Sequence, residues 1–245
     1  MLFIVVQRSN HMKTRDTLIL AIALLASAIV WSYSFHAARK PDRVIRTVGS
    51  ASRRFQTDTV KWTVRVVRQA PPQNTAPTYG ALRDDVNQII EHLESQGISR
   101  DHIAVQPLMT NPNYDREGQL RGYRLQQSMT VISNAVDTVD QLALDPDPIV
   151  SKGIIIEYSQ LEYFYSKVDE LKHELLGMAA EDARQRAQEI ASSTGSRIGT
   201  IHSARAGVFQ ITEPFSTEVS GYGVYNTTSK EKDIKITVHA EFNVE

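Results

Sequence analysis

The chain has 245 residues, with 27 Lys and Arg residues against 28 Asp and Glu residues and a formal net charge of -1 at pH 7. This balance provides no global positive field, so we expect no nucleic-acid partner. The absence of cysteine excludes disulfides, thiolate catalysis and cysteine-ligated metals. The length accommodates a membrane segment followed by one larger globular unit.

The N-terminal part of the chain predicts a membrane anchor. The segment Thr17–Phe35 is apolar and uncharged, and it follows the basic residues Lys13 and Arg15. A helix of this length can cross a membrane. Trp31 and Tyr33, near its far end, suit a membrane–water interface. We therefore expect one N-terminal transmembrane helix over residues 17–35.

Two features of the sequence leave open whether the apolar segment is cleaved and on which side of the membrane the domain lies. The triplet Ala26-Ser27-Ala28 has the small residues of a signal-peptidase site, although apolar residues follow it, so a cleaved signal is the alternative to an anchor. More basic residues follow the apolar run than precede it, which by charge alone places the domain in the cytoplasm. The short tail of residues 1–16, in which Met12 is a second candidate start, is typical of a signal anchor and favours the opposite orientation.

A basic, proline-containing linker of residues 36–43 leads to the folded part, residues 44–245. Between Thr57 and Val67 apolar and polar residues alternate, which predicts a half-buried strand. The prolines that follow end this strand, because proline cannot donate to a strand ladder. Apolar residues at helical spacing then predict a helix that ends at Gly97.

The rest of the chain predicts a similar order of elements. Two strands, Ile103–Leu108 and Tyr123–Ile132, enclose a turn-rich connection. A helix over Val136–Leu144 ends at an Asp-Pro repeat, and Ile154–Tyr158 forms another strand. The longest helix is expected over Ser166–Thr194, where Val168, Leu171, Leu175, Met178, Ala179, Ala183, Ala187 and Ile190 trace an apolar stripe.

Two further strands, Thr200–Ile211 and Ile234–Val244, complete the pattern. The order β-α-β-β thus occurs twice, beginning near Thr57 and near Ile154. We predict an α+β fold of two β-α-β-β units with antiparallel-rich sheets and packed helices, preceded by one N-terminal transmembrane helix. The side chains expected to point inward include Trp62, Ile89, Leu93, Leu175 and Ile190.

Several local patterns together resemble the SIMPL-domain family, which includes bacterial periplasmic immunogenic proteins. They are the Val48-Gly49 step, the helix end SQGI, the hairpin YDREGQLRGY, and the segment EDARQRAQEIASSTGSRIGTI from Glu181 to Ile201. The similarity covers Ile45 to Val244. It implies an α+β fold, export, ring-like homo-oligomers and a connection with envelope or oxidative stress, and it implies no catalytic residues. On this basis we expect a single-pass protein of the bacterial inner membrane whose domain lies in the periplasm or outside the cell, with secretion after cleavage as the alternative.

The motifs of known chemistry are absent or incomplete. Asn113, Asp115 and Glu117 resemble the first half of a calcium loop, but Arg124 stands where the final carboxylate is required. The chain contains no zinc-binding H-E-x-x-H, no G-x-S-x-G and no glycine-rich phosphate loop. We therefore expect no metal, no cofactor and no catalytic residue. An exported hydrolase or redox enzyme, with a site assembled from scattered residues, is the alternative function.

Six aromatic residues are candidate interface residues: Tyr163, Phe164, Tyr165, Phe215, Tyr222 and Tyr225. The first three are consecutive, so no regular element can bury all of them on one face. The other three lie in a connection of about 20 residues, which is long for a compact domain. A loop that covers its own domain is the alternative explanation. We expect a non-catalytic oligomeric scaffold or binding module, with a second copy and an envelope protein as partners.

Overall fold

The computed structural model describes residues 14–38 and 43–245, and within the first helix the side chains of residues 17–35. Helix α1 (Thr14–Ala38) contains the predicted apolar run, and its described side chains are not buried in the protein. The predicted helix is confirmed as a candidate transmembrane or signal helix. Residues 1–13 of the predicted tail, including Met12, and residues 39–42 of the predicted linker lie outside the described residues.

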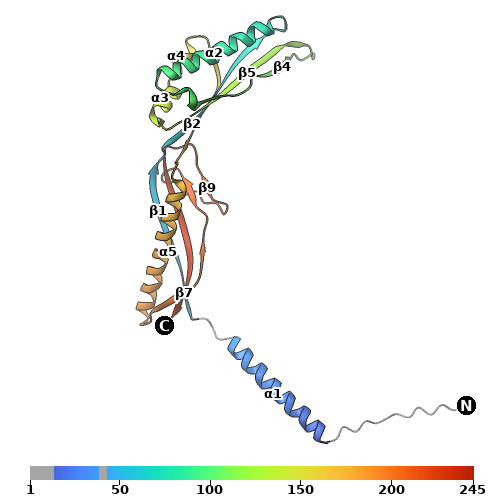
Figure 1. Cartoon of the computed structure of the whole chain (residues 1–245), viewed down its shortest axis with the longest axis vertical. Coiled ribbons are helices and arrows are strands. Elements are labelled where there is room, and N and C mark those ends of the chain that lie inside the picture. Colours follow the sequence, from blue (N-terminus) through green and yellow to red (C-terminus); the bar gives the residue numbers. More distant parts are fainter. Residues whose placement is uncertain (1–13, 39–42) are drawn as a thin grey trace, which may run out of the picture.

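The first of two sheets, sheet A, carries the chain's N-proximal and C-proximal strands (Figure 1). The order is β1-β10-β8-β9, and β7 also lies beside β10. Neighbouring strands are antiparallel, except that β8 and β9 are parallel. The strands are β1 (Val44–Gln56), β7 (Ile198–Ala206), β8 (Gln210–Thr212), β9 (Val224–Tyr225) and β10 (Glu231–Val244).

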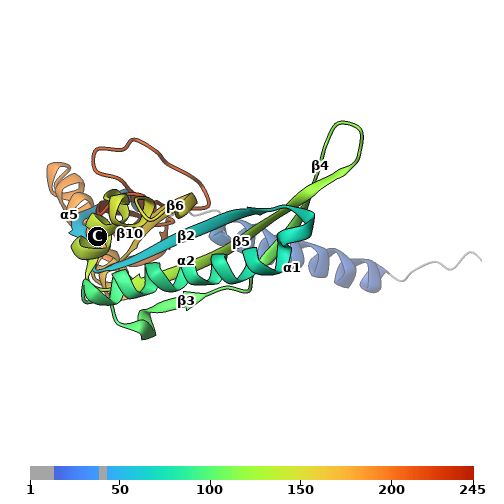
Figure 2. The ribbon, with the colours of Figure 1, turned by 90° about the horizontal axis from the view of Figure 1, so that it is seen from above.

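Sheet B is built from the middle of the chain and is antiparallel throughout. The order is β3-β5-β2-β6, and β4 also lies beside β5. Strands β4 and β5 form a hairpin that extends beyond the helix on this sheet (Figure 2). The strands are β2 (Thr59–Ala70), β3 (Ile103–Val105), β4 (Met109–Tyr114), β5 (Leu120–Ser133) and β6 (Ile155–Phe164).

The helices are divided between the two sheets (Figure 1). Helices α2 (Thr75–Ser95) and α3 (Val136–Leu144) pack on sheet B, followed by the short α4 (Asp147–Val150). The long helix α5 (Val168–Ser193) packs on β1 and β10 of sheet A. Two short 3-10 turns, Pro72–Asn74 and Arg100–His102, flank α2 and β3. The predicted α+β fold with antiparallel-rich sheets and packed helices is confirmed.

The core between sheet B and its helices contains large side chains. Trp62 of β2 is 1% exposed, and Leu82, Ile89 and Leu93 of α2 are fully buried. On the sheet side they meet residues such as Leu125. The alternation in β2 and the helical spacing in α2 therefore place Trp62, Ile89 and Leu93 inward, as predicted.

The core between sheet A and α5 is made differently, from small residues at close backbone distance. Ala179, Ala183 and Ala187 of α5 are fully buried and form a ridge with a spacing of four residues. Opposite them, a Cβ atom added to Gly49 of β1 would lie 2.1 Å from the carbonyl oxygen of Ala179. Glycine is therefore required at this point, and Leu175, as predicted, is buried farther along the same ridge.

Two residues of the apolar stripe predicted for α5 are exposed. Met178 is 48% exposed and Ile190 is 46% exposed. The prediction that Ile190 points inward is wrong, because the buried ridge continues to Ala191, which is fully buried. Neighbouring positions on a helix differ by about 100°, so Ile190 is turned toward the flank.

The strands of the predicted second β-α-β-β unit do not lie in one sheet. Strand β6, which was expected to open it, pairs with β2 in sheet B, whereas β1 pairs with β10 in sheet A. At the turn between β1 and β2, Thr57 N–H donates to the carbonyl of Lys230 and Asp58 N–H to that of Phe164. These bonds direct the two strands into different sheets. The strand expected over Thr200–Ile211 is also divided, into β7 and β8.

Candidate binding surface

The face of sheet A that points away from α5 is called the open face below. Burial alternates along β1 and β10, so every second residue of each strand reaches this face. The strand register aligns these residues in pairs across β1 and β10. From the end nearest α1 in sequence, the pairs are Arg46 with Glu241, Val48 with His239, Ser50 with Thr237, Ser52 with Lys235, and Arg54 with Asp233.

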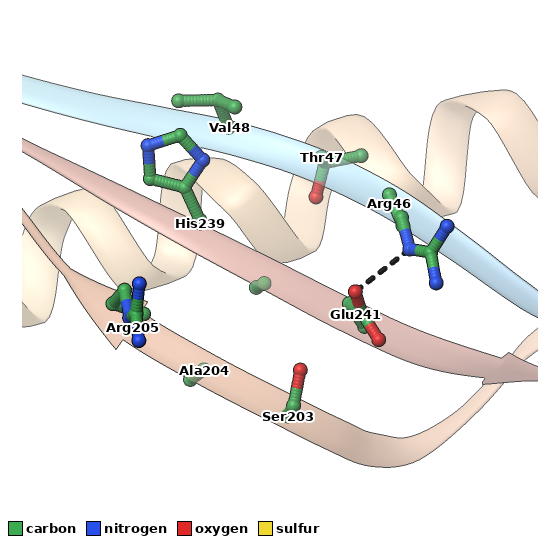
Figure 3. Close-up of a pocket in the computed structure, with 9 residues that line it drawn as sticks. Arg46, Thr47, Val48, Ser203, Ala204, Arg205, His239 and Glu241 are labelled. Carbon is green, nitrogen blue, oxygen red and sulfur yellow. Dashed lines mark hydrogen bonds and ion pairs between the residues drawn. The ribbon is translucent and has the colours of Figure 1, made fainter.

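One end of the open face has a hollow of about 660 Å³ across β1, β10 and β7 (Figure 3). Arg46 Nε donates to Glu241 Oε1 at 2.7 Å, and this bond is the main reason that the pKa of Glu241 lies below its usual value. In the next row the register places His239 between Val48 and Arg205. The floor of the hollow thus combines a paired arginine with an exposed imidazole and a second guanidinium.

The other end of the open face has a second hollow, of about 650 Å³. Arg54 donates from Nε and Nη2 to the two carboxylate oxygens of Asp233, at 2.8 and 3.0 Å. This bidentate pair holds the pKa of Asp233 below its usual value. The hollow is bounded on one side by residues 216–219, which belong to the connection between β8 and β10.

This connection, residues 213–230, is called the aromatic loop below. Ser220 is fixed to Gln210 by two hydrogen bonds: Gln210 Nε2 donates to its carbonyl at 2.8 Å, and its N–H donates to Gln210 Oε1 at 3.2 Å. The backbone N–H of Phe215 donates to Asp233 at 3.4 Å, and the guanidinium of Arg54 lies 4.5 Å from the centre of the Phe215 ring. The first half of the loop is therefore held against the open face.

The second half of the aromatic loop is organised around Asn226. Its Oδ1 accepts hydrogen bonds from the N–H groups of Thr228 and Ser229, and its Nδ2 donates to Glu213 at 2.8 Å. Its carbonyl accepts a bond of 2.6 Å from Nζ of Lys232, which is fully buried. Burial lowers the pKa of Lys232 to about 8. Both ends of the loop are thus anchored in the fold.

The structure divides the six predicted interface residues into two groups. Phe215 is 86% exposed and Tyr222 is fully exposed on the aromatic loop. Tyr225 is 42% exposed and stacks on Phe164, with 6.3 Å between the ring centres. Tyr163 is 6% exposed, and its hydroxyl donates to Asp140. Tyr165 is partly buried and packs against Phe55.

These positions decide which of the six can contact another molecule. The Tyr163 hydroxyl is occupied by a bond within the fold, and both burial and Asp140 raise its pKa. Tyr163 and Tyr165 therefore serve internal packing. Phe164 and Tyr225 pack mainly on each other. Phe215 and Tyr222 remain as the aromatic side chains of the loop that are mostly exposed, whereas Tyr225 is exposed only in part.

The calcium-like segment forms a hairpin tip between β4 and β5. Asp115 Oδ1 accepts hydrogen bonds from the backbone N–H groups of Glu117 and Gln119, at 3.1 and 2.8 Å. Arg121 binds its other carboxylate oxygen at 2.9 Å. The Asp115 carboxylate therefore holds the turn. Within residues 14–38 and 43–245, no group of three or more His, Asp or Glu side chains has the geometry of a metal site.

A family model described as SIMPL, protein of unknown function (DUF541), matches residues 45–244. The chain belongs to the SIMPL family. The comparison with curated proteins gives no match. The SIMPL match begins just inside β1 and ends with β10, so it includes both sheets and helices α2 to α5. The family resemblance read from the sequence is thereby confirmed, and α1 precedes the matched region.

Arg205 and His239, which line the first hollow, are not among the site residues predicted from the sequence, and Val48 is named there only for the family resemblance. Alternation in the predicted strand Ile234–Val244 does place His239 on its polar face. The neighbours of His239 could not be found in this way, because β1 and β7 are remote from β10 in sequence.

Proposed function

We propose that this SIMPL-family protein is a membrane-anchored, non-catalytic binding module that faces the cell envelope. The aromatic loop contacts a second copy of the chain and, in an assembled form, an envelope protein that takes part in envelope or oxidative stress. Helix α1 supports the anchor, since it is long and apolar enough to cross a membrane. The loop supports the binding role, because it is ordered and exposes large aromatic side chains.

The observation that carries this proposal is the backbone at Phe215. Its φ is 64°, the only positive φ of a non-glycine residue in the described chain. A bulky side chain in this conformation costs on the order of 1–3 kcal/mol. Within the chain the Phe215 ring gains the contact with Arg54, which contributes about 0.5–1 kcal/mol at an exposed site. The strain therefore serves to present an aromatic ring that is 86% exposed.

A strained, exposed aromatic residue beside a second one is typical of an interface anchor. Tyr222 is fully exposed, and Val219 between the two positions is 79% exposed. Burying an aliphatic or aromatic side chain contributes about 1.5–3 kcal/mol. The loop is already ordered by its bonds to Gln210 and Asp233, so little further entropy is lost when a partner binds.

The test replaces the two exposed aromatic residues together, Phe215→Ser and Tyr222→Ser, in the full-length chain in detergent. Tyr225 is retained because it packs on Phe164. We expect the variant to sediment as smaller species in analytical ultracentrifugation and to recover less of its partner from the native envelope. Circular dichroism is expected to stay unchanged, because neither ring is buried in the protein.

The matched control is Tyr114→Ser, which removes an aromatic side chain that is 59% exposed on β4 of sheet B. This variant is expected to assemble as the unmodified chain does. Unchanged assembly and partner recovery after the Phe215 and Tyr222 replacements would refute the role of the loop. Loss of a substrate turnover in the same variant would instead favour an enzyme.

The anchor is tested separately. We expect the mature protein to retain Thr17–Phe35, because apolar residues follow the Ala26-Ser27-Ala28 triplet. Intact-mass measurement checks this, and a mature chain that begins after Ala28 or Ala38 would show that the helix is a cleaved signal. Protease accessibility in spheroplasts checks the orientation, and protection of the domain would place it in the cytoplasm.

A further inference from the structure

The middle of the open face carries positive charge and no acidic strand residue. It consists of three rows across sheet A: Ser52, Lys235 and Gln210; Ser50 and Thr237, with Gly207 beside them; and Val48, His239 and Arg205. The rows beyond them at each end do contain acids, Glu241 and Asp233, and there each acid pairs with an arginine. The cations of the middle rows are the ones that lack such a pair.

Two of these cations are available to bind a ligand. The side chains of Arg205 and Lys235 are exposed, and neither has a hydrogen-bond or ion-pair partner among the residues that the structure describes. Glu218 of the aromatic loop lines the second hollow together with Lys235, but the two form no ion pair. A guanidinium and an ammonium on one open sheet face are suited to bind phosphate oxygens.

Hydroxyl groups lie between the two cations. Thr237 and Ser50 occupy the middle row, and Gly207 leaves the Thr237 hydroxyl uncovered, since a Cβ atom at Gly207 would lie 2.8 Å from Thr237 Oγ1. Along β10, Lys235 and His239 are four residues apart, which corresponds to about 13 Å. The middle rows therefore offer separate cations with hydroxyl donors between them, a pattern that fits several phosphate groups better than one.

The short connection between α1 and β1 keeps the open face close to any membrane that holds α1. Helix α1 ends at Ala38 and β1 begins at Val44, so the connection between them can span at most about 20 Å. Val48, in the row nearest that end, follows Val44 by four residues of strand, or about 13 Å. When α1 lies in a membrane, the row of Val48 can therefore be at most about 33 Å from the end of α1, and the tether keeps the middle rows near the membrane surface. This tether gives the surface a high effective concentration.

We propose that the middle of the open face binds the phosphate groups of anionic phospholipids in the membrane that holds α1. Arg205 and Lys235 provide the charge, and Ser50 and Thr237 provide hydrogen-bond donors. Docking holds sheet A against the headgroups and fixes the orientation of the aromatic loop relative to the membrane. The inference rests on the anchoring part of the proposed function and is independent of a protein partner.

The test uses the full chain in lipid nanodiscs of phosphatidylcholine, with or without phosphatidylglycerol. The chain has no cysteine, so a Ser203→Cys variant accepts a single donor dye at the edge of the open face. Energy transfer to acceptor-labelled headgroups in the same disc then reports docking. We expect transfer to rise when the anionic lipid is present and to fall again at high salt, which screens exposed charges.

Removing the two cations, Arg205→Gln and Lys235→Gln, is expected to lower the ratio of docked to undocked domain roughly 25-fold, since each cation near an anionic surface contributes about fivefold. The matched control, Arg83→Gln and Lys152→Gln, makes the same change in net charge at two exposed residues on or near the helices of sheet B. It is expected to dock as the unmodified chain does.

Three outcomes would overturn the proposal. Equal transfer in neutral and anionic discs would show that lipid phosphate is not bound, and an equal loss in the control pair would show that only net charge matters. Saturable binding of inorganic phosphate in neutral discs, measured by calorimetry, without lipid-dependent transfer, would assign the face to a soluble phosphate compound. Failure of the chain to co-purify with the discs would be a failure of the anchor, which distinguishes it from these results.

Discussion

Replacement of Gly49 by alanine is expected to push α5 away from β1 of sheet A and so to destabilise the fold. The added Cβ atom would lie 2.1 Å from the carbonyl oxygen of Ala179 and 2.3 Å from the backbone nitrogen of Ala183. Both are backbone atoms of a regular helix, so no rotation of a side chain can relieve the clash. The helix must move away from β1 by roughly 1 Å to restore normal contact distances.

The cost follows from what this movement disrupts. Overpacking of a close-packed core costs about 1–3 kcal/mol. The movement also weakens the bond of 2.8 Å that Thr47 Oγ1 donates to the carbonyl of Ala183, a buried hydrogen bond that contributes about 1 kcal/mol. We therefore expect Gly49→Ala to lower the free energy of unfolding by about 2–4 kcal/mol.

Guanidinium unfolding of the full chain in detergent, followed by far-ultraviolet circular dichroism, measures this loss. Gly177→Ala is the matched control, because it lies in α5 and, apart from its own turn of helix, no atom lies within 4 Å of the added Cβ. In a helix interior this change is expected to stabilise by about 1 kcal/mol, the opposite sign. A Gly49→Ala variant within about 0.5 kcal/mol of the unmodified chain would refute the close-contact argument.

Two further predictions concern buried charges, those of Asp85 and Lys232. Arg68→Met is expected to lower the free energy of unfolding by about 3–5 kcal/mol, because Asp85 is 2% exposed and its carboxylate loses the guanidinium that binds it at 2.6 Å. Combining Arg68→Met with Asp85→Leu should recover most of this loss, since no buried carboxylate is then left without a partner. Chemical unfolding measures both variants, and an equal loss in the two would contradict this explanation. The pKa of Lys232 is about 8 in the folded chain, against an ordinary value of 10.5. Between pH 8 and pH 10.5 the unfolded state therefore binds more protons than the folded state, and the contribution of Lys232 to the free energy of unfolding rises with pH. Lys232→Met should lack that rise, and parallel stability curves of the two proteins from pH 8 to 10.5 would show that the folded pKa is not depressed.

The amino-acid sequence by itself determined the features that depend on near neighbours. The apolar run Thr17–Phe35 is sufficient to predict a long apolar helix, since its length and lack of charge are local properties. The predicted helix Val136–Leu144 has the same bounds in the structure. Trp62, Ile89 and Leu93 are buried as their periodicity predicts, because a periodic pattern fixes which side chains share a face.

On the long helix, periodicity was sufficient to predict the element but not the centre of its buried face. The large aliphatic side chain of Ile190 predicts that the buried face of the helix includes position 190, whereas the structure buries the smaller Ala191. Gly49 lets β1 approach α5 closely at Ala179 and Ala183, so the helix turns the ridge of small residues toward the sheet, and that ridge continues to Ala191. A choice of this kind depends on a strand more than 100 residues away, which the local pattern does not contain.

Strand pairing and the binding surface were decided only by the tertiary structure. Alternation shows which side chains of β10 share a face, but it does not show which strands lie beside β10. The pairing of β1 with β10, and of β6 with β2, is set by contacts between segments far apart in the chain. Arg205 and His239 are neighbours for this reason, and the positive middle of the open face exists only once β1, β10 and β7 are side by side.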